Sequence, residues 1–281
     1  MVRKFLLVFV LFIFPGLIKA QKTTVEYGSN ASAGHYLNSG GVNLYYEEYG
    51  KGEPLVLLHG NGGNINYMSP QIEYFAKNYH VIAMDCRGRG KSELGKDSLT
   101  YMQMTIDLNA LLNHLKLDSA YIIGRSDGGI LALMMAIYYP AKTKKIAAFG
   151  ANILPDTTAI YPGDFTGIIN EAKMADEMMA KKDTSKNWHL IRLRNRMMQF
   201  QPHISVSDLG KIKCPTLILS CDRDEIKEAH TLLIYLNITK ANLCIFTGET
   251  HRITKQNPLL FNTTVDRFFS EPYKGAEYRT H

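Results

Sequence analysis

The sequence lacks the signals of several protein classes. Its four cysteines, Cys86, Cys214, Cys221 and Cys244, do not form the paired short spacings of a zinc site. No internal repeat or low-complexity run interrupts the 281 residues, of which 46% are hydrophobic and 21% charged. No basic cluster interleaved with aromatic residues indicates nucleic-acid binding. We therefore expect a globular protein with no bound metal and no nucleic-acid partner.

The N-terminus carries an apolar run that is too short to span a membrane. Two basic residues precede the almost wholly apolar stretch 5–18, and Ala20 offers a cleavage point. A helical span needs roughly 20 apolar residues, so the pattern favours a secretory signal peptide over 1–20 rather than an anchor. Its removal deletes three basic residues and lowers the formal net charge from +6 to +3. We expect an exported protein, periplasmic or secreted, without a stable membrane span.

Export would permit a disulfide between Cys221 and Cys244. These residues fall in two segments that we expect to be neighbouring strands. The alternative interpretation is that both are small buried thiols within those strands.

The stretch 121–137 carries the strongest functional signal. A short run ending a buried strand leads into Gly124-Arg-Ser-Asp-Gly128, and an apolar helix-like run begins at Ile130. Gly-x-Ser-x-Gly between a strand and a helix is typical of a nucleophile elbow. Without β-carbons the two glycines let strand and helix pass closely, and Ser126 lies beside the helix N-terminus, where N–H groups stabilise an anion. We predict Ser126 as the nucleophile.

An earlier buried strand, 54–58, ends in the polar loop His59-Gly-Asn-Gly-Gly-Asn64. Such a loop lies at the carboxyl edge of an open α/β sheet, where ligands bind. We predict an oxyanion hole formed by the backbone N–H groups of Asn61 and Asp127. His59 is expected to be a structural hydrogen-bonding residue. Upstream, the alternating stretch 41–49 predicts an antiparallel hairpin, turned at 50–52.

A basic, glycine-rich turn, 85–92, follows the next buried strand. It lacks the Walker spacing and the strand-to-helix GxGxxG arrangement of phosphate sites. We predict instead that Asp85 and Arg87 pair with each other and fix the loop. The segments 69–79 and 99–115 are expected to be helices.

Three motifs now stand in order between alternating strands and helices: His59-Gly60, Asp85-x-Arg-Gly-x-Gly-x-Ser92 and Gly124-x-Ser-x-Gly-Gly129. Together they resemble the α/β-hydrolase superfamily over nearly all of 41–269. The aspartate after the serine and the later Phe149-Gly-Ala-Asn152 look most like the valacyclovir hydrolase (biphenyl-hydrolase-like) branch. The resemblance implies the α/β-hydrolase fold, a mostly parallel central sheet flanked by helices, with an inserted helical cap.

Residues 153–213 show no buried-strand pattern. Within them, 165–181 and 187–200 are amphipathic and rich in methionine, which predicts helices. In the resembling superfamily such an insertion roofs the active site. We therefore expect a core made of 21–152 and 214–281, with 153–213 as the cap.

The second half of the core supplies the remaining catalytic candidates. A histidine just beyond the last strand gives the chain order Ser, Asp, His of this fold, and His251 has that position. The resemblance implies Asp224, the second of two aspartates after a strand, as the triad acid. Asp222 is the alternative, and Cys221 stands where the family usually has glycine.

These roles predict a carboxylic ester hydrolase with a Ser-His-Asp triad and a small-molecule ester as substrate. His251 removes the Ser126 proton, Asp224 holds the imidazole, and water releases the acyl group. This chemistry needs no cofactor. In the resembling branch the residue matching Asp127 contacts the substrate's amino group, which favours α-amino acid esters, although Arg125 adds a like charge nearby. The alternative is that Asp127 caps the following helix.

Other functions remain open on the same residues. A lactonase or C–C bond hydrolase would use the same triad and differ in the cap pocket. A non-catalytic binding protein would keep the fold without turnover. Serine, rather than aspartate, at position 126 argues against a dehalogenase or an epoxide hydrolase.

Overall fold

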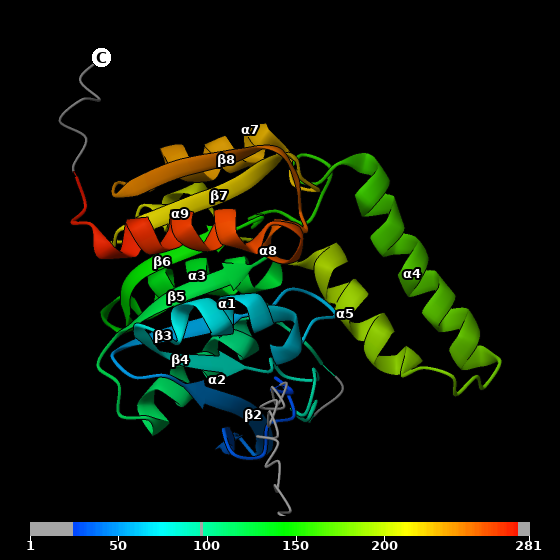
Figure 1. Ribbon diagram of the computed structural model, residues 1–281. Coiled ribbons are helices and arrows are strands. Elements are labelled where there is room, and N and C mark those ends of the chain that lie inside the picture. The colour runs from blue at the N-terminus through cyan, green and yellow to red at the C-terminus, as the bar shows by residue number, and fades with distance from the viewer. Residues whose placement is uncertain (1–24, 96–97, 275–281) are drawn as a thin grey trace, which may run out of the picture.

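A computed structural model describes residues 25–95 and 98–274, so the predicted signal peptide, 1–20, lies outside the described residues. Its centre is an eight-stranded sheet with the order β1-β2-β4-β3-β5-β6-β7-β8 (Figure 1). The β1–β2 and β2–β4 pairs are antiparallel and all the others are parallel. This mostly parallel sheet confirms the predicted α/β-hydrolase fold. The strands are β1 Gly34–Ser39, β2 Val42–Tyr49, β3 Glu53–Leu58, β4 Tyr79–Met84, β5 Ala120–Arg125, β6 Thr143–Phe149, β7 Thr216–Arg223 and β8 Ala241–Thr250.

Helices cover both faces of the sheet. The α-helices are α1 Ser69–Phe75, α2 Tyr101–His114, α3 Asp127–Tyr138, α4 Pro162–Ala180, α5 Trp188–Phe200, α6 Val206–Leu209, α7 Glu228–Leu236, α8 Ile253–Gln256 and α9 Pro258–Ser270, and the 3-10 helices are η1 Ile65–Met68 and η2 Pro140–Lys142. Side chains of α2, α3 and α7 pack in the core on one face, and those of α1, α8 and α9 pack on the other.

The central strands are buried because they face helices on both sides. In β3, Val56 and Leu58 point into one core while Leu55 and Leu57 point into the other, and all four are at most 1% exposed. Alternate side chains of a strand point to opposite faces of the sheet, so a continuous apolar run fits a doubly covered strand. The burial of each such side chain contributes roughly 1.5–3 kcal/mol.

The chain between β6 and β7 leaves the sheet. In its described residues it forms α4, α5 and the short α6. An isolated β-bridge joins Ile160 of this segment to Ile226, which lies just after β7. In Figure 1, α4 and α5 lie together to one side of the sheet. Both helices were predicted, and Asn187 caps α5 by accepting a hydrogen bond from the N–H of Leu190.

Two expectations about the first half are wrong. The hairpin is formed by β1 and β2, and its turn is at Gly40–Gly41. The predicted turn, 50–52, instead connects β2 to β3. These two strands are not neighbours, because β4 lies between them. Helix α1 ends at Phe75, earlier than predicted, because β4 already begins at Tyr79.

The predicted Asp85–Arg87 pair is also wrong. Arg87 binds Asp107 of α2 through two hydrogen bonds of 2.6 and 2.8 Å. The Asp85 carboxylate instead accepts the N–H groups of Ile65 and Lys91, each at 2.8 Å. Both side chains fix the loop after β4, as expected, but with partners distant in sequence.

No helix in the described ranges is long and apolar enough to cross a membrane.

Candidate active site

Ser126 occupies a tight turn between β5 and α3. Its backbone has φ 54° and ψ −119°, and its N–H donates to the carbonyl of Phe149 at 2.8 Å. A β-carbon at Gly124 would lie 2.0 Å from the Gly128 carbonyl oxygen, and one at Gly128 would lie 2.3 Å from that of Leu58. Positive φ in a non-glycine residue costs of order 1–3 kcal/mol. The close passage of strand and helix that the two glycines predict is confirmed.

His251 follows β8 and meets Asp224, which follows β7. Nδ1 of His251 lies 2.6 Å from Oδ1 of Asp224, and the two side chains are 5% and 0% exposed. The imidazole stacks on the ring of Phe149 with centroids 5.6 Å apart. The carboxylate and the aromatic ring together fix the orientation of the imidazole.

Asp224 is held in its ionised form by the groups around it. Burial by itself would raise the pKa of this carboxyl, but hydrogen bonding and attraction from His251, with the N–H groups of Ile226 and Cys221, outweigh burial and lower the pKa below its usual value. Asp222 lies elsewhere: its carboxylate accepts the N–H of Gly248 at 2.8 and 2.9 Å and is exposed. Of the two candidate aspartates, the structure brings Asp224 to the histidine.

Gly150 makes room for the imidazole, and the sequence analysis did not assign it this role. Its φ is +59°, and a β-carbon there would lie 2.5 Å from Cε1 and 2.8 Å from Nδ1 of His251. The sequence feature that could have indicated this role is the position of Gly150 directly after a buried strand, at the carboxyl edge of the sheet. The close approach to His251 depends on a contact across about 100 positions of sequence, which no local pattern reveals.

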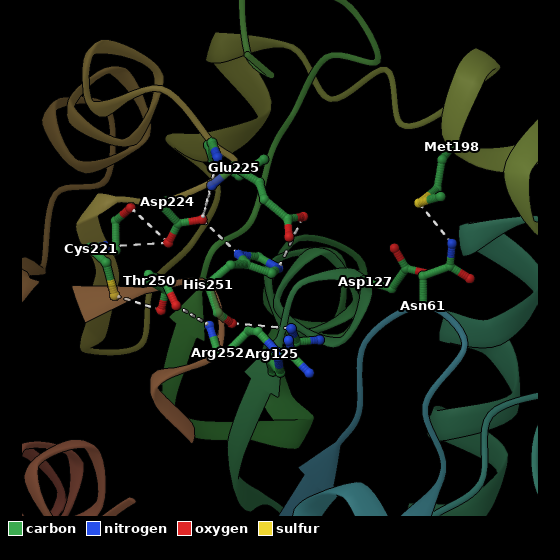
Figure 2. A network of polar contacts seen from close by, with 12 residues as sticks. Asn61, Arg125, Asp127, Met198, Cys221, Asp224, Glu225, Thr250, His251 and Arg252 are labelled. Carbon is green, nitrogen blue, oxygen red and sulfur yellow. Dashed lines mark hydrogen bonds and ion pairs between the residues drawn. The ribbon is translucent and has the colours of Figure 1, made fainter. Parts of the chain in front are cut away.

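Ser126 and His251 line one cavity of about 410 Å³ between the sheet and α4 and α5. Nε2 of His251 is buried and makes no hydrogen bond within the described part of the chain, to Ser126 included. Figure 2 shows the imidazole with Asp224 on one side and Glu225 on the other; Oε2 of Glu225 is 3.8 Å from Nε2. Catalytic hydrogen bonds are often long without substrate, so the missing bond is no argument against the predicted Ser126–His251 pair.

The loop after β3 lies directly beside Ser126. A β-carbon at Gly60 would lie 2.9 Å from Cβ of Ser126, so only glycine permits this approach. The side chain of Asn61 donates to Sδ of Met198 on α5 at 2.9 Å (Figure 2) and accepts from Arg89 at 3.3 Å. The loop that carries Asn61 therefore lies beside Ser126, and the oxyanion role of the Asn61 N–H stays a prediction.

His59 plays the structural part predicted for it. Its Nε2 accepts the N–H of Cys86 at 3.1 Å, so the proton lies on Nδ1, which donates to the carbonyl of Gly60 at 2.8 Å. Burial lowers the pKa of His59 to about 4.

Asp127 lines the cavity, and one of its carboxylate oxygens is engaged, because Oδ1 accepts the Tyr101 hydroxyl at 2.8 Å. The alternative expectation, that Asp127 caps α3, is wrong, because Ser126 stands at the cap position and Asp127 is the first helical residue. Burial raises the pKa of Asp127, although the charge of Arg89 and the Tyr101 hydrogen bond oppose the increase. The Asp127 N–H, in the first turn, lacks an intrahelical acceptor.

All four cysteines are free thiols, so Cys221 and Cys244 do not pair. Cys221 Sγ donates to the Thr250 carbonyl at 3.2 Å, beside His251 in sequence. The described residues contain no group of three histidine, cysteine or acidic side chains placed to hold a metal ion.

Comparison with known proteins supports the superfamily resemblance. A sequence model of the alpha/beta hydrolase fold family matches residues 53–180. Serine hydrolase BPHL of Mus musculus is 26% identical over 249 residues, which are 81% of this chain and 83% of that protein. The enol-lactonase structure from Burkholderia xenovorans LB400 has a TM-score of 0.72 at 20% identity and covers 84% of this chain and 100% of its own.

Other curated relatives match only in part. The (E)-2-((N-methylformamido)methylene)succinate hydrolase of Acinetobacter baylyi is 38% identical over 105 residues, which are 37% of this chain and 39% of that protein. In three relatives matched at 30% identity or more, the chain spans only 25% to 42% of their own length.

Proposed function

The chain has the α/β-hydrolase fold, and on that premise we propose that it is a serine hydrolase that cleaves carboxylic esters of small molecules. One observation carries the proposal. Ser126, at the strained turn, and His251, bound to the buried Asp224 at 2.6 Å, open into the same cavity.

The proposed reaction has two stages. The Ser126 hydroxyl attacks the ester carbonyl while Nε2 of His251 takes its proton and then transfers it to the leaving alcohol. Asp224 fixes the tautomer with the proton on Nδ1 and stabilises the imidazolium. Water, activated by the same histidine, then releases the acid from the acyl-enzyme. The backbone N–H groups of Asp127 and Asn61 are the proposed donors to the oxyanion.

The charges in the cavity favour an ester over the anionic substrates of some relatives. Four carboxylates line the cavity, those of Asp127, Asp164, Glu171 and Glu225. Arg125 also lines it, but its guanidinium donates to the His251 carbonyl at 3.1 Å and lies over the ring of Tyr67. The Acinetobacter baylyi relative is named for a succinate; a dicarboxylate would meet repulsion here.

Lactones and C–C bonds remain the alternative substrates for the same triad. A lactone is a cyclic ester, so the same attack opens it without a separate alcohol product. Product analysis distinguishes the three cases: an alcohol and an acid, one hydroxy acid, or a ketone or enol with an acid.

A preference for α-amino acid esters belongs to the same proposal. Oδ1 of Asp127 is taken by Tyr101, and among the described residues Oδ2 accepts no hydrogen bond. Asp127→Asn is expected to reduce the discrimination between amino acyl and neutral acyl esters. Unchanged discrimination would place the preference elsewhere.

Hydrolysis of a small ester panel by the wild type and by Ser126→Ala tests the proposal. We expect neutral or amino acyl esters to be cleaved by the wild type, and the rate to fall by about 10⁶ in the variant, as when a triad serine is removed. Retained hydrolysis in a folded Ser126→Ala protein would refute the assignment.

We also propose export after cleavage of 1–20, on the sequence pattern alone. N-terminal sequencing of the protein purified from its natural host would contradict this if Met1 were still present.

A further inference from the structure

Glu225 brings a negative charge to the reacting atoms. Its Oε2 lies 3.8 Å from Nε2 of His251, and its side chain is 54% exposed, facing the cavity (Figure 2). In the described residues, this carboxylate makes no other ion pair or hydrogen bond. The sequence analysis did not identify Glu225, because the residue stands out only once His251 is placed beside it.

Two of the other carboxylates that line the cavity, those of Glu171 and Asp127, are already compensated near their own positions. Glu171 binds Arg194 at 2.9 Å and Asn195 at 2.8 Å. Asp127 accepts the Tyr101 hydroxyl and lies in the field of Arg89. Of the carboxylates near the catalytic imidazole, Glu225 is therefore the one that is open to a cation from solvent.

The position of this carboxylate identifies the part of the substrate that it meets. In the proposed reaction Nε2 transfers its proton to the oxygen of the leaving alcohol, so that oxygen lies within hydrogen-bond distance of Nε2. A group 3.8 Å from Nε2 is therefore close enough to border the alcohol part of the ester.

The backbone holds Glu225 in this place. Its N–H donates to Oδ1 of Asp224 at 2.7 Å, and its carbonyl accepts the N–H of Tyr161 at 3.0 Å. The cavity also has room beside α4: a β-carbon at Gly163 or Gly167 would meet nothing within 4 Å. Asp164, exposed between these glycines, adds a second negative charge to that side.

We propose that Glu225 forms a cation subsite for the leaving group, so that the enzyme prefers esters whose alcohol carries an ammonium group. The inference rests on the proposed serine hydrolase function and names its substrate class. It differs from the Asp127 prediction, which concerns an amino group on the acyl side.

The test compares two acetate esters of the same shape. In acetylcholine the alcohol carries a quaternary nitrogen, and in 3,3-dimethylbutyl acetate a carbon replaces that nitrogen. The wild type is expected to have the higher kcat/KM for acetylcholine. In Glu225→Gln the ratio of the two kcat/KM values is expected to fall by about three- to tenfold, the worth of a partly exposed ion pair.

Glu53→Gln is the matched control. This variant also removes one negative charge, but at the first residue of β3, at the opposite end of the strand from the active site. There Glu53 binds Lys144 at 2.8 Å. The ratio is expected to stay constant in this variant. Thermal unfolding of both variants checks that each remains folded.

The outcomes separate the two proposals. A ratio that is unchanged in folded Glu225→Gln, or that changes equally in Glu53→Gln, overturns the subsite while leaving the serine hydrolase intact. Failure of the wild type to cleave any ester of either panel overturns the proposed function itself. A ratio that falls only in Glu225→Gln, and falls less at high salt, supports the subsite.

Discussion

The cavity wall supplied by the sheet differs from the wall supplied by α4 in how closely its backbone is packed. At Gly124, Gly128 and Gly150 an added β-carbon would lie 2.0, 2.3 and 2.5 Å from another atom. At Gly163 and Gly167 of α4 it would meet nothing within 4 Å. An added atom would therefore collide at these three glycines beside the proposed triad, whereas the two glycines of α4 leave space that different side chains can fill.

The acidic groups of the two walls differ in the same way. Asp224 accepts hydrogen bonds from the histidine and from backbone N–H groups, and Asp127 accepts one from Tyr101. Asp164 on α4 is exposed to solvent. Reaction chemistry needs fixed groups, and substrate choice needs accessible ones. We infer that the fixed groups of the sheet wall set the reaction and that the accessible carboxylates, Glu225 after β7 and Asp164 on α4, set the substrate.

The largest effect is expected for Asp224→Asn on the sheet wall. An amide cannot hold the required tautomer of His251, so kcat is expected to fall by about 10⁴. Steady-state ester hydrolysis measures this loss. Asp222→Asn, which changes the exposed carboxylate two positions earlier, is the control and should retain activity within about tenfold. An equal loss in both variants would contradict the assignment of Asp224.

Gly150→Ala is expected to have the next largest effect. The added methyl group would displace His251, and alanine at φ +59° would be strained by about 1–3 kcal/mol. Because a misplacement of about 1 Å can cost a factor of 10² in rate, we expect kcat to fall by about that factor. If kcat and the free energy of unfolding in urea were both the same in Gly150→Ala as in the wild type, close packing at this position would be contradicted.

Acid unfolding tests the environment of Asp224. Its pKa is lowered in the folded protein, so its contribution to stability is present above the unfolded pKa of about 3.9 and is lost as pH falls through the lower folded value. The free energy of unfolding of wild type and Asp224→Asn, from urea titrations between neutral and acid pH, is expected to converge as the pH falls. If the difference in free energy of unfolding between the two proteins grew toward acid pH, the lowered pKa of Asp224 would be contradicted.

The smallest effect is expected for Gly167→Ala on the α4 wall. Alanine is favoured over glycine in a helix by up to about 1 kcal/mol, so stability should rise slightly. One methyl group in the cavity is expected to change kcat/KM for bulky esters by no more than about tenfold. A loss as large as that of Gly150→Ala would show that the two walls are equally constrained.

The sequence was sufficient for the parts of the site that depend on local pattern and chain order. The elbow at Ser126 follows from glycine spacing between a strand and a helix, and the place of His251 follows from the order of the last strand. Hydrophobic periodicity also predicts the buried central strands and the two helices at 165–181 and 187–200, which the structure has at 162–180 and 188–200.

Two of the failed predictions concern partners across long sequence separations. Arg87 binds Asp107 rather than Asp85 because packing of α2 on the sheet brings the second carboxylate into position. The hairpin turn was misplaced because β4 inserts between β2 and β3. Residue propensity and spacing predict where a strand runs, but they do not predict which strand pairs with it. The glycine-rich turn at 50–52 was therefore interpreted as the turn of a hairpin.

Covalent labelling of the nucleophilic serine tests the central claim most directly. The intact protein and Ser126→Ala would be treated with a fluorophosphonate ester, digested, and analysed by mass spectrometry. We predict one covalent adduct on the peptide that contains Ser126, formed at a rate that falls sharply in Asp224→Asn and absent from Ser126→Ala. An adduct on another residue, or ester hydrolysis that persists after Ser126 is fully labelled, would contradict a reaction centred on the sheet wall.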